Sequence, residues 1–364
     1  MSAPRLQIDL DKIQHNVRTL VERLASRGVS VTGVTKSTLG APEVAHAMLQ
    51  AGVSDLADSR IENIEAMRGS HVPARMSLIR SPMLSQARRV VTSADVSFNS
   101  ELEVVRRLSR EARSLDRTHA VVLMVELGDL REGIMPVDLP AAVREILALP
   151  NIMLKGLGTN LACRSGTSPD DANMGELSRL ATVIEKTFDI SLEIVSGGNS
   201  ANLEWVFNSE HTGRINNLRL GESILLGREA LHRRVIEGLY TDAITLVAEV
   251  IESKVKPTKP WGVLAQSAFE IRPVAKSRGT VSQSILAIGI QDVDPCSLLP
   301  PEGTEIVGCS SDHLLLASSV DNVAVGAEIT FELGYSALLR AMTSPFVTKS
   351  FKPVSSTSGL RKSA

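Results

Sequence analysis

The sequence predicts an α/β fold, with an N-terminal (β/α)8 TIM barrel followed by a C-terminal, mostly β domain. Short β-rich runs alternate with helical segments eight times over about 230 residues, close to the usual size of such a barrel. Beyond Arg234 the alternation stops, and strand-like runs follow one another with few helical segments between them. We therefore expect the barrel over residues 1–234, the β domain over 235–350 and a disordered tail over 351–364.

The elements of the barrel follow from hydrophobic periodicity. After a short strand-like opening at residues 6–10, apolar residues at helical spacing predict an amphipathic helix: Ile13, Val17, Leu20, Val21 and Leu24. The eight barrel strands are expected near residues 29–35, 54–58, 76–80, 95–99, 119–126, 152–158, 191–196 and 216–220. The clearest helices between them are expected over 41–51, 100–115, 139–148 and 170–188.

The last part of the chain carries a different pattern. Apolar, β-rich runs predict strands over 243–251, 284–288, 305–307 and 324–330. Prolines punctuate the region, and long helical segments are sparse. This combination predicts the mostly β second domain.

The composition argues against several classes of function. The chain has 39 basic and 41 acidic residues and a net charge of -2, which provides no electrostatic basis for binding nucleic acid or an anionic membrane. Its three cysteines, Cys163, Cys296 and Cys309, are too few and too scattered for a disulfide framework or a zinc site. No apolar run reaches the roughly 18 residues of a membrane span, and the N-terminus lacks the apolar core of a signal peptide. We expect a cytoplasmic protein that binds a small molecule and no metal.

Polar residues follow the expected barrel strands at their C-terminal ends, where the functional groups of this fold lie. Lys36 follows the first strand. An amine held there can lose its proton through desolvation or a neighbouring cation and then attack a carbonyl carbon. The alternative is a solvated lysine at a strand end. Arg131 follows the fifth strand and Arg219 lies in the eighth, and turn chemistry explains these arginines less well than it explains Gly, Asn, Asp or Ser.

The loop after the seventh strand, residues 196–200, has the composition of an anion site. Its two glycines allow close backbone approach, and Asn199 and Ser200 can open a helix whose free N–H groups favour phosphate. Gly221 and Glu222 follow the eighth strand, and phosphate sites in this fold often lie between strands seven and eight. A plain glycine-rich turn is the alternative. A lysine that traps aldehydes and a phosphate site in one barrel suggest pyridoxal phosphate.

Several motifs also resemble a known family. Residues 5–16, 34–36 and 218–221 resemble the alanine racemase superfamily, the fold-type III pyridoxal phosphate enzymes. Residues 56–63, 128–133, 158–161, 196–200, 217–222 and 310–313 resemble its ornithine racemase branch. The resemblance spans nearly the whole chain. It implies an amino-acid racemase, an isomerase, that acts on ornithine or another basic amino acid as a homodimer with shared active sites.

The resemblance assigns roles to individual residues. Lys36 would hold the cofactor covalently and act as one of the bases. Arg219 would face the pyridine nitrogen, and because arginine does not readily give up a proton, this nitrogen would stay unprotonated, which favours reprotonation of the α-carbon over transamination. The phosphate would be held by Asn199, Ser200, Gly221 and Glu222. The substrate would be bound by Arg131, for which a loop salt bridge is the alternative, and by Ser311 and Asp312.

Two positions depart from the alanine racemases. Asn160 stands where a histidine usually lies against the cofactor ring, so that stacking comes from elsewhere or is weaker. Ile290 stands where a tyrosine serves as the opposite-face base, and isoleucine cannot move a proton. The replacement candidates are Asp292, His313 and Cys309, offered by a second subunit if the family's head-to-tail dimer is retained. Their alternatives are a turn cap for Asp292, a surface or interface histidine for His313 and a small buried hydrophobe for Cys309.

Other functions remain open at this stage. The missing tyrosine raises the alternative hypothesis that the protein is a fold-type III decarboxylase or aldolase. A noncatalytic pyridoxal phosphate carrier is suggested by related single-barrel proteins, although the residues beyond the barrel weigh against it. A cofactor-free Schiff-base aldolase predicts protein without visible cofactor absorption. No acidic pocket for a substrate's distal ammonium can be read from the sequence, so the substrate is open.

Overall fold

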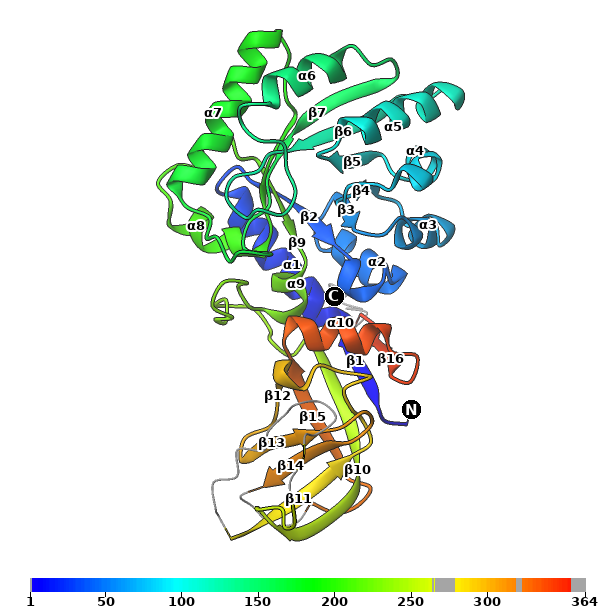
Figure 1. Ribbon diagram of the computed structural model, residues 1–364, viewed down its shortest axis with the longest axis vertical. Coiled ribbons are helices and arrows are strands. Elements are labelled where there is room, and N and C mark those ends of the chain that lie inside the picture. Colours follow the sequence, from blue (N-terminus) through cyan, green and yellow to red (C-terminus); the bar gives the residue numbers. More distant parts are fainter. Residues whose placement is uncertain (1, 264, 266–278, 319–322, 355–364) are drawn as a thin grey trace, which may run out of the picture. The chain divides into compact units, whose positions relative to one another are not determined.

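The structure is a computed structural model that describes residues 2–263, 265, 279–318 and 323–354. Its contacts divide the chain into two compact units (Figure 1), one formed by Ile13–Tyr240 and the other by the residues before and after this segment. Within the described ranges, no helix combines the length and the apolar character that crossing a bilayer requires. The expected division into a barrel and a mostly β part is observed, although the N-terminal strand belongs to the second unit.

Eight parallel strands close into a barrel in the first unit, which confirms the expected fold. They are β2 (Ser30–Val34), β3 (Asp55–Asp58), β4 (Arg75–Leu78), β5 (Val96–Asn99), β6 (His119–Met124), β7 (Ile152–Gly158), β8 (Ile194–Gly198) and β9 (Asn217–Leu220). The strands pair in chain order, and β2 pairs with β9 to complete the ring, with Thr32 level with Arg219. Residues that follow β2 and β9 therefore meet at the same point of the rim.

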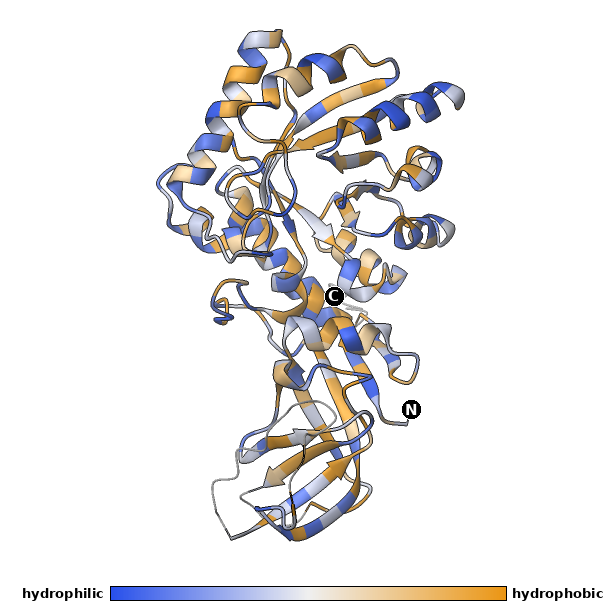
Figure 2. Ribbon diagram, in the orientation of Figure 1, coloured by the Kyte–Doolittle hydropathy of each residue, from blue (hydrophilic) through white to orange (hydrophobic). Residues whose placement is uncertain are grey.

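Helices surround the barrel strands (Figure 1). They are α1 (Leu10–Ala25), α2 (Pro42–Gln50), α3 (Ile61–Gly69), α4 (Ala87–Ser93), α5 (Leu102–Ser114), α6 (Leu139–Leu147), α7 (Asp171–Phe188), α8 (Leu203–Asn208) and α9 (Glu222–Leu226), with short 3-10 turns η1 (Lys36–Thr38), η2 (Leu84–Gln86) and η3 (Ser200–Asn202). Ile13, Val17, Leu20 and Leu24 of α1 are fully buried, and burial of each such side chain contributes about 1.5–3 kcal/mol. Figure 2 shows the same pattern, with apolar strands and helices of mixed character.

The seventh barrel strand differs from its expected range. It begins at Ile194 rather than near residue 191, and the N–H of the preceding Leu192 donates to the Glu185 carboxylate of α7 at 2.9 Å. It also continues through Gly198, which was expected in the loop. Gly198 has φ +145°, and a Cβ there would lie 2.2 Å from Asn202 Oδ1, so this position requires glycine.

In the described part of the second unit, eight strands form one sheet. Its elements are β1 (Arg5–Asp9), β10 (Ile244–Pro257), β11 (Thr280–Leu286), η4 (Pro295–Ser297), β12 (Leu298–Leu299), β13 (Thr304–Cys309), β14 (Leu314–Ser318), β15 (Glu328–Leu333), α10 (Tyr335–Thr343) and β16 (Thr348–Lys352). The strand order is β12-β15-β10-β11-β14-β13, and β1 lies between β10 and β16. The N-terminal strand, expected in the barrel domain, therefore completes this sheet.

The chain beyond residue 350 was expected to be a disordered tail. Phe351 and Lys352 instead belong to β16, where Phe351 pairs with Ile8 of β1. Residues 355–364 lie outside the described residues. The described part of the sheet thus extends slightly beyond the expected end of the domain.

A buried histidine is expected to make the stability of the barrel depend on pH. His119 is 2% exposed, and its Nε2 lies 2.8 Å from Ser97 Oγ. Burial lowers the pKa of His119 from its ordinary 6.5 to about 4. In the unfolded chain His119 therefore binds its proton below about pH 6.5, whereas in the native state it binds the proton only near pH 4. As the pH falls from about 6.5 to about 4, this difference lowers the free energy of unfolding by roughly 3 kcal/mol.

Urea unfolding at pH 7.5 and 4.5 measures this effect. We expect the difference in unfolding free energy between the two pH values to be smaller in His119→Gln than in the wild type. His211→Gln, which changes an exposed histidine, is the matched control and is expected to behave as the wild type. Equal pH dependence in all three proteins would show that His119 is not the group responsible.

Candidate active site

Lys36 is the first residue of η1, and only Thr35 separates it from the end of β2. The preceding Thr35 is fully buried, and its hydroxyl donates to Asp58 Oδ2 at 2.8 Å. Asp58, at the end of β3, also accepts from the Arg60 N–H at 2.9 Å and from Asn63 Nδ2 at 3.0 Å. Burial raises the pKa of Asp58, while these donors lower it. The backbone that carries Lys36 is thus tied to the neighbouring strand.

The residues after β9 lie beside Lys36. The positive charge of Lys36 lowers the pKa of the Glu222 carboxyl, although burial, the larger effect, raises it. The Glu222 side chain forms an ion pair with Arg233. A Cβ built on Gly221 would lie 3.1 Å from the Val34 carbonyl oxygen, so glycine lets the ends of β2 and β9 approach closely. Lys36, Gly221 and Glu222 therefore share one part of the rim, as their strand positions predicted.

Arg219 is a buried cation held from several strands. It is 5% exposed; Nη1 donates to Ser196 Oγ on β8, and Nη2 donates to the Thr159 carbonyl after β7 at 2.8 Å. Its Cζ lies 5.0 Å from the centroid of the Phe98 ring, within the range of a cation–π contact. Burial lowers the pKa of Arg219 to about 10. The guanidinium is therefore still charged at neutral pH and fixed in orientation.

Two hydroxyls meet where the chain turns after β8 and β9. Ser200 is 3% exposed, its Oγ lies 3.0 Å from Ser223 Oγ, and it accepts the Ser223 N–H at 3.2 Å. Asn199 caps η3 by accepting the Ala201 N–H at 2.8 Å, whereas its Nδ2 donates to Asn160 Oδ1 and the Leu161 carbonyl, each at 3.0 Å. The Asn199 side chain thus ties the loops after β7 and β8 together. Sequence reasoning missed Ser223, which looks in the sequence like an ordinary residue of a helical first turn.

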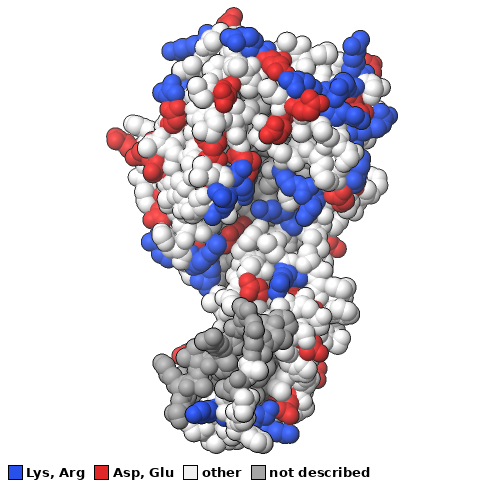
Figure 3. Space-filling model, viewed as in Figure 1, with Lys and Arg blue, Asp and Glu red and all other residues white. Residues whose placement is uncertain are grey.

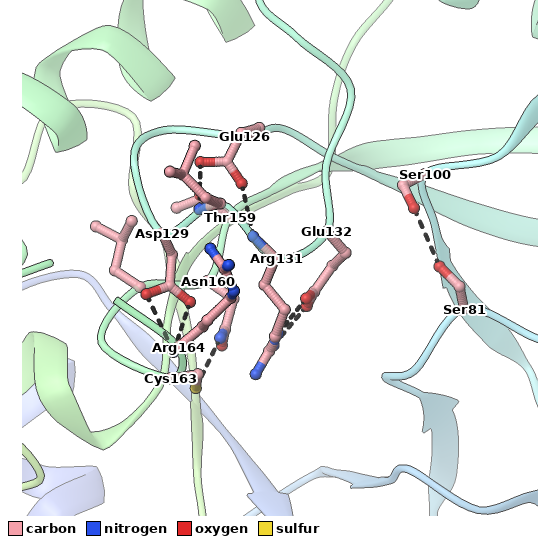
Figure 4. A network of polar contacts seen from close by, with 12 residues as sticks. Ser81, Ser100, Glu126, Asp129, Arg131, Glu132, Thr159, Asn160, Cys163 and Arg164 are labelled. Atoms are coloured by element: carbon pink, nitrogen blue, oxygen red, sulfur yellow. Dashed lines mark hydrogen bonds and ion pairs between the residues drawn. The ribbon is translucent and has the colours of Figure 1, made fainter. Parts of the chain in front are cut away.

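Asn160, in the loop after β7, contacts both Arg219 and Cys163, and Figure 4 shows the contact with Cys163. Its Oδ1 lies 3.4 Å from Arg219 Nη2, and its Nδ2 donates to Cys163 Sγ at 2.9 Å. Arg131, from the loop after β6, pairs with Glu132. The hydrogen bond with Glu132 is the main cause that raises the pKa of Arg131, and Cys163 raises it further. Sequence reasoning missed Glu132 and this placement of Cys163, because neither follows from strand spacing.

The candidates for an opposite-face base lie in the second unit, and two of them are engaged otherwise. Asp292 is 5% exposed, and its Oδ1 accepts from Ser344 Oγ at 2.7 Å. Burial raises the pKa of Cys309 to about 11, so its thiol is protonated at neutral pH. These surroundings favour a structural role for Asp292 and disfavour proton uptake by Cys309.

His313 pairs with the neighbouring Asp312. Its Nδ1 lies 2.8 Å from Asp312 Oδ1, and this hydrogen bond is the main cause that lowers the pKa of Asp312. Ser311 Oγ also donates to Asp312 Oδ1, at 3.0 Å. The turn is tied to the segment that carries Ile290, because the Ile290 N–H donates to the Ser310 carbonyl at 2.9 Å. Within the second unit, His313 therefore lies close in the fold to the position without a tyrosine.

Comparisons with known proteins agree with this architecture. The family model described as alanine racemase, N-terminal domain, matches residues 8–229. An ornithine racemase from Acetoanaerobium sticklandii is 38% identical over 351 residues, which cover 95% of this chain and 99% of the relative. A lysine racemase from Thermotoga maritima is 37% identical over 355 residues, which cover 97% of this chain and 99% of the relative.

The fold is also found among solved structures. The alanine racemase from Streptomyces coelicolor A3(2) matches with a TM-score of 0.75 and 18% identity, over 95% of this chain and 97% of that chain. At this identity the likeness concerns the fold. Together with the family match over more than half of the chain and the two nearly full-length relatives, it shows that this chain belongs to the alanine racemase family.

Proposed function

We propose that this protein is a pyridoxal phosphate-dependent amino-acid racemase that interconverts the L and D enantiomers of a basic amino acid such as ornithine or lysine. The observation that carries the proposal is that Lys36 lies close to Glu222, which directly follows Gly221 at the end of β9, the strand that holds the buried cation Arg219. The ornithine and lysine racemases that resemble this chain over nearly its full length support both the reaction and the substrate class.

The residues present fit this cofactor. Lys36 offers an amine, Arg219 offers fixed N–H donors, and the adjacent hydroxyls of Ser200 and Ser223 offer donors for a phosphate. The rim at Gly221 is so close to Val34 that a side chain there would fill it. When bound, pyridoxal phosphate supplies an electron sink that makes the α-proton of an amino acid acidic enough to be removed.

Each residue then has a distinct task. Lys36 holds the cofactor and exchanges a proton with the α-carbon on one face. Arg219 would offer N–H donors to the ring nitrogen of the cofactor, and because arginine does not readily yield a proton, that nitrogen would stay unprotonated. Ser200 and the backbone at Gly221 and Glu222 hold the phosphate, with Asn199 fixing the shape of the loop. The Glu222 carboxylate is paired with Arg233, so the backbone N–H is the group that Glu222 contributes.

The proton on the opposite face requires a second carrier. We assign it to His313 of a second subunit in a cytoplasmic homodimer, because the Asp312 carboxylate engages the imidazole through Nδ1, so that Nε2 is the nitrogen that would exchange the proton. Ser311 and Asp312 then contribute to substrate binding by holding this turn in place. The surroundings of Asp292 and Cys309 support this choice, since one is buried against Ser344 and the other holds its proton.

Chiral product analysis tests the proposal. The purified protein is incubated with pyridoxal phosphate and separately with L-ornithine, L-lysine and L-alanine. We expect formation of the D enantiomers of the basic amino acids until the two forms are equal, and a slower reaction of alanine. Release of carbon dioxide or of an aldehyde would instead indicate decarboxylation or aldol cleavage. A bound-cofactor spectrum without any turnover would indicate a carrier.

A further inference from the structure

We propose that Glu132 is a positioning residue for substrate binding: its carboxylate holds one edge of the Arg131 guanidinium, so that the other edge is presented to the carboxylate of the amino acid. This inference rests on the proposed racemase function. It adds a residue that neither the strand spacing nor the comparisons single out. The argument depends on the loop after β6, on the geometry of the ion pair and on the charges around it.

The loop that carries the pair is folded by contacts that do not involve Glu132 (Figure 4). The Glu126 carboxylate accepts backbone N–H groups from Gly128 at 2.5 Å, Leu130 at 3.0 Å and Arg131 at 3.3 Å. Gly133 has φ +145°, and a Cβ there would lie 2.3 Å from the Glu126 nitrogen. The chain can therefore fold back on β6 at this point only with glycine.

A second set of contacts joins this loop to the one after β7. Asp129 is 1% exposed, and its carboxylate accepts the backbone N–H groups of Arg164 and Ser165, at 3.1 and 3.0 Å. Ser165 Oγ in turn donates to the Asp129 carbonyl at 2.7 Å. The loop after β6 is thus held at its centre as well as at its ends. The contacts that hold the backbone of this loop therefore do not depend on the Glu132 side chain.

The ion pair uses one edge of the guanidinium. Arg131 donates through Nε to Glu132 Oε2 and through Nη2 to Glu132 Oε1, the latter at 2.5 Å. Neither bond uses Nη1. Arg131 also has the Cys163 side chain as a neighbour that raises its pKa through a hydrogen bond and through charge. The planar guanidinium has a second edge, formed by Nη1 and the other hydrogen of Nη2, and such an edge matches a carboxylate in two-point geometry. Glu132 is the less exposed partner, with 25% of its side chain exposed against 41% for Arg131.

The charges at the rim support the same role. Arg131 lowers the pKa of the buried Arg219, whereas Glu132 raises it, although burial of Arg219 is the larger effect. Both side chains therefore act on the region of Arg219. Two arginines that converge on one site repel each other, and Glu132 offsets this repulsion. Without this carboxylate, a conformation in which the Arg131 side chain turns away from Arg219 toward solvent would be lower in electrostatic energy.

The test compares Glu132→Gln with a matched control. Glu176 of α7 holds Arg179 in the same two-point manner, at 2.7 and 2.6 Å, on the outer surface of the barrel unit. We expect Glu132→Gln to raise KM for ornithine about tenfold or more while kcat changes less, because a charge-assisted contact that orients the substrate is weakened. Glu176→Gln is expected to leave both parameters unchanged. Glu132→Asp, which keeps the charge, is expected to restore part of the loss.

Two probe molecules separate carboxylate binding from other effects. Pentanoate has a carboxylate but no amine, and pentylamine has an amine but no carboxylate. We expect Glu132→Gln to weaken competitive inhibition by pentanoate about tenfold. The spectral change that pentylamine causes in the cofactor-loaded protein, and the thermal unfolding midpoint, are expected to stay as in the wild type. Equal weakening of both probes would indicate a general structural role and overturn the inference.

The outcomes distinguish this inference from the proposed function. If the wild type racemises ornithine but Glu132→Gln equals Glu176→Gln in KM and in pentanoate inhibition, the positioning role is wrong and the racemase assignment stands. If the wild type neither binds pyridoxal phosphate nor racemises a basic amino acid, both fall together. Should Glu132→Gln fail to fold, the same measurements are made on Glu132→Asp. We expect this variant to have a KM for ornithine and an inhibition by pentanoate that lie between those of the wild type and a complete loss, and values equal to the wild type would overturn the inference.

Discussion

Replacing Lys36 with alanine is expected to reduce racemisation of the best substrate by at least about 10³-fold, because the change removes both the covalent holder of the cofactor and one proton carrier. The fold is expected to persist, since the Thr35 hydroxyl and the Asp58 carboxylate hold the backbone at this rim. The measurement is the initial rate of D-ornithine formation together with the visible spectrum of the protein. Added methylamine is expected to restore a small part of the activity by supplying the missing amine.

Two controls belong to this experiment. Lys36→Arg keeps a positive charge but cannot readily give up a proton, and is expected to be as inactive as Lys36→Ala. Lys186→Ala changes an exposed lysine of α7 and is expected to retain full activity. If Lys36→Ala racemised at the native rate, the assignment of Lys36 would be wrong.

Replacing Arg219 with glutamine is expected to slow racemisation about 10²- to 10³-fold, the usual cost of removing a preorganised charged donor from an active site. Formation of the 2-oxo acid per racemisation event is expected to rise. Without Arg219 the ring nitrogen is no longer kept unprotonated, and its unprotonated state is what disfavours transamination. The free energy of unfolding is expected to fall by about 1–3 kcal/mol, since the Thr159 carbonyl and Ser196 lose the guanidinium donors.

Chiral analysis, an assay for 2-oxo acids and urea unfolding measure these three effects. Arg219→Lys keeps the charge and is expected to retain more of the stability than Arg219→Gln. Arg179→Gln, on the outer surface, is the control for loss of an arginine. An Arg219→Gln protein with native rate and product ratio would contradict the role of Arg219 at the ring.

Much of the barrel could be predicted because its signals are local. Each strand is a short β-rich run bounded by turn residues, and its C-terminal end is known once the run is located. Lys36, Gly221 and Glu222 come together for this reason. The place of β1 could not be predicted in the same way, since its partners β10 and β16 lie more than 200 residues away in the sequence and nothing local encodes such pairing.

Other features depended on contacts that only a folded chain reveals. Glu132 is one of many acidic residues in the sequence, and its role at the rim follows from its distance to Arg131 and its effect on Arg219. Helix α10 had a usable signal, because Ala337, Leu338, Ala341 and Met342 recur at helical spacing and are buried. The β-rich character of the surrounding chain obscured that pattern.

The surface of the barrel unit agrees with a small-molecule partner. Acidic and basic side chains are interspersed on the face drawn in Figure 3, and many of the arginines are paired with carboxylates, as Arg89 is with Glu65. Such pairs contribute little to stability when exposed.

The central claim is that Lys36 and a second carrier move the α-proton of an amino acid between opposite faces. It is tested most directly by incubating the wild type and Lys36→Ala with pure L-ornithine in deuterium oxide, and following the α-hydrogen by NMR and the enantiomers by chiral chromatography. The account predicts D-ornithine that carries deuterium at the α-carbon from the earliest times with the wild type, and neither exchange nor inversion with Lys36→Ala. Inversion without deuterium incorporation, or equal exchange in the two proteins, would contradict it.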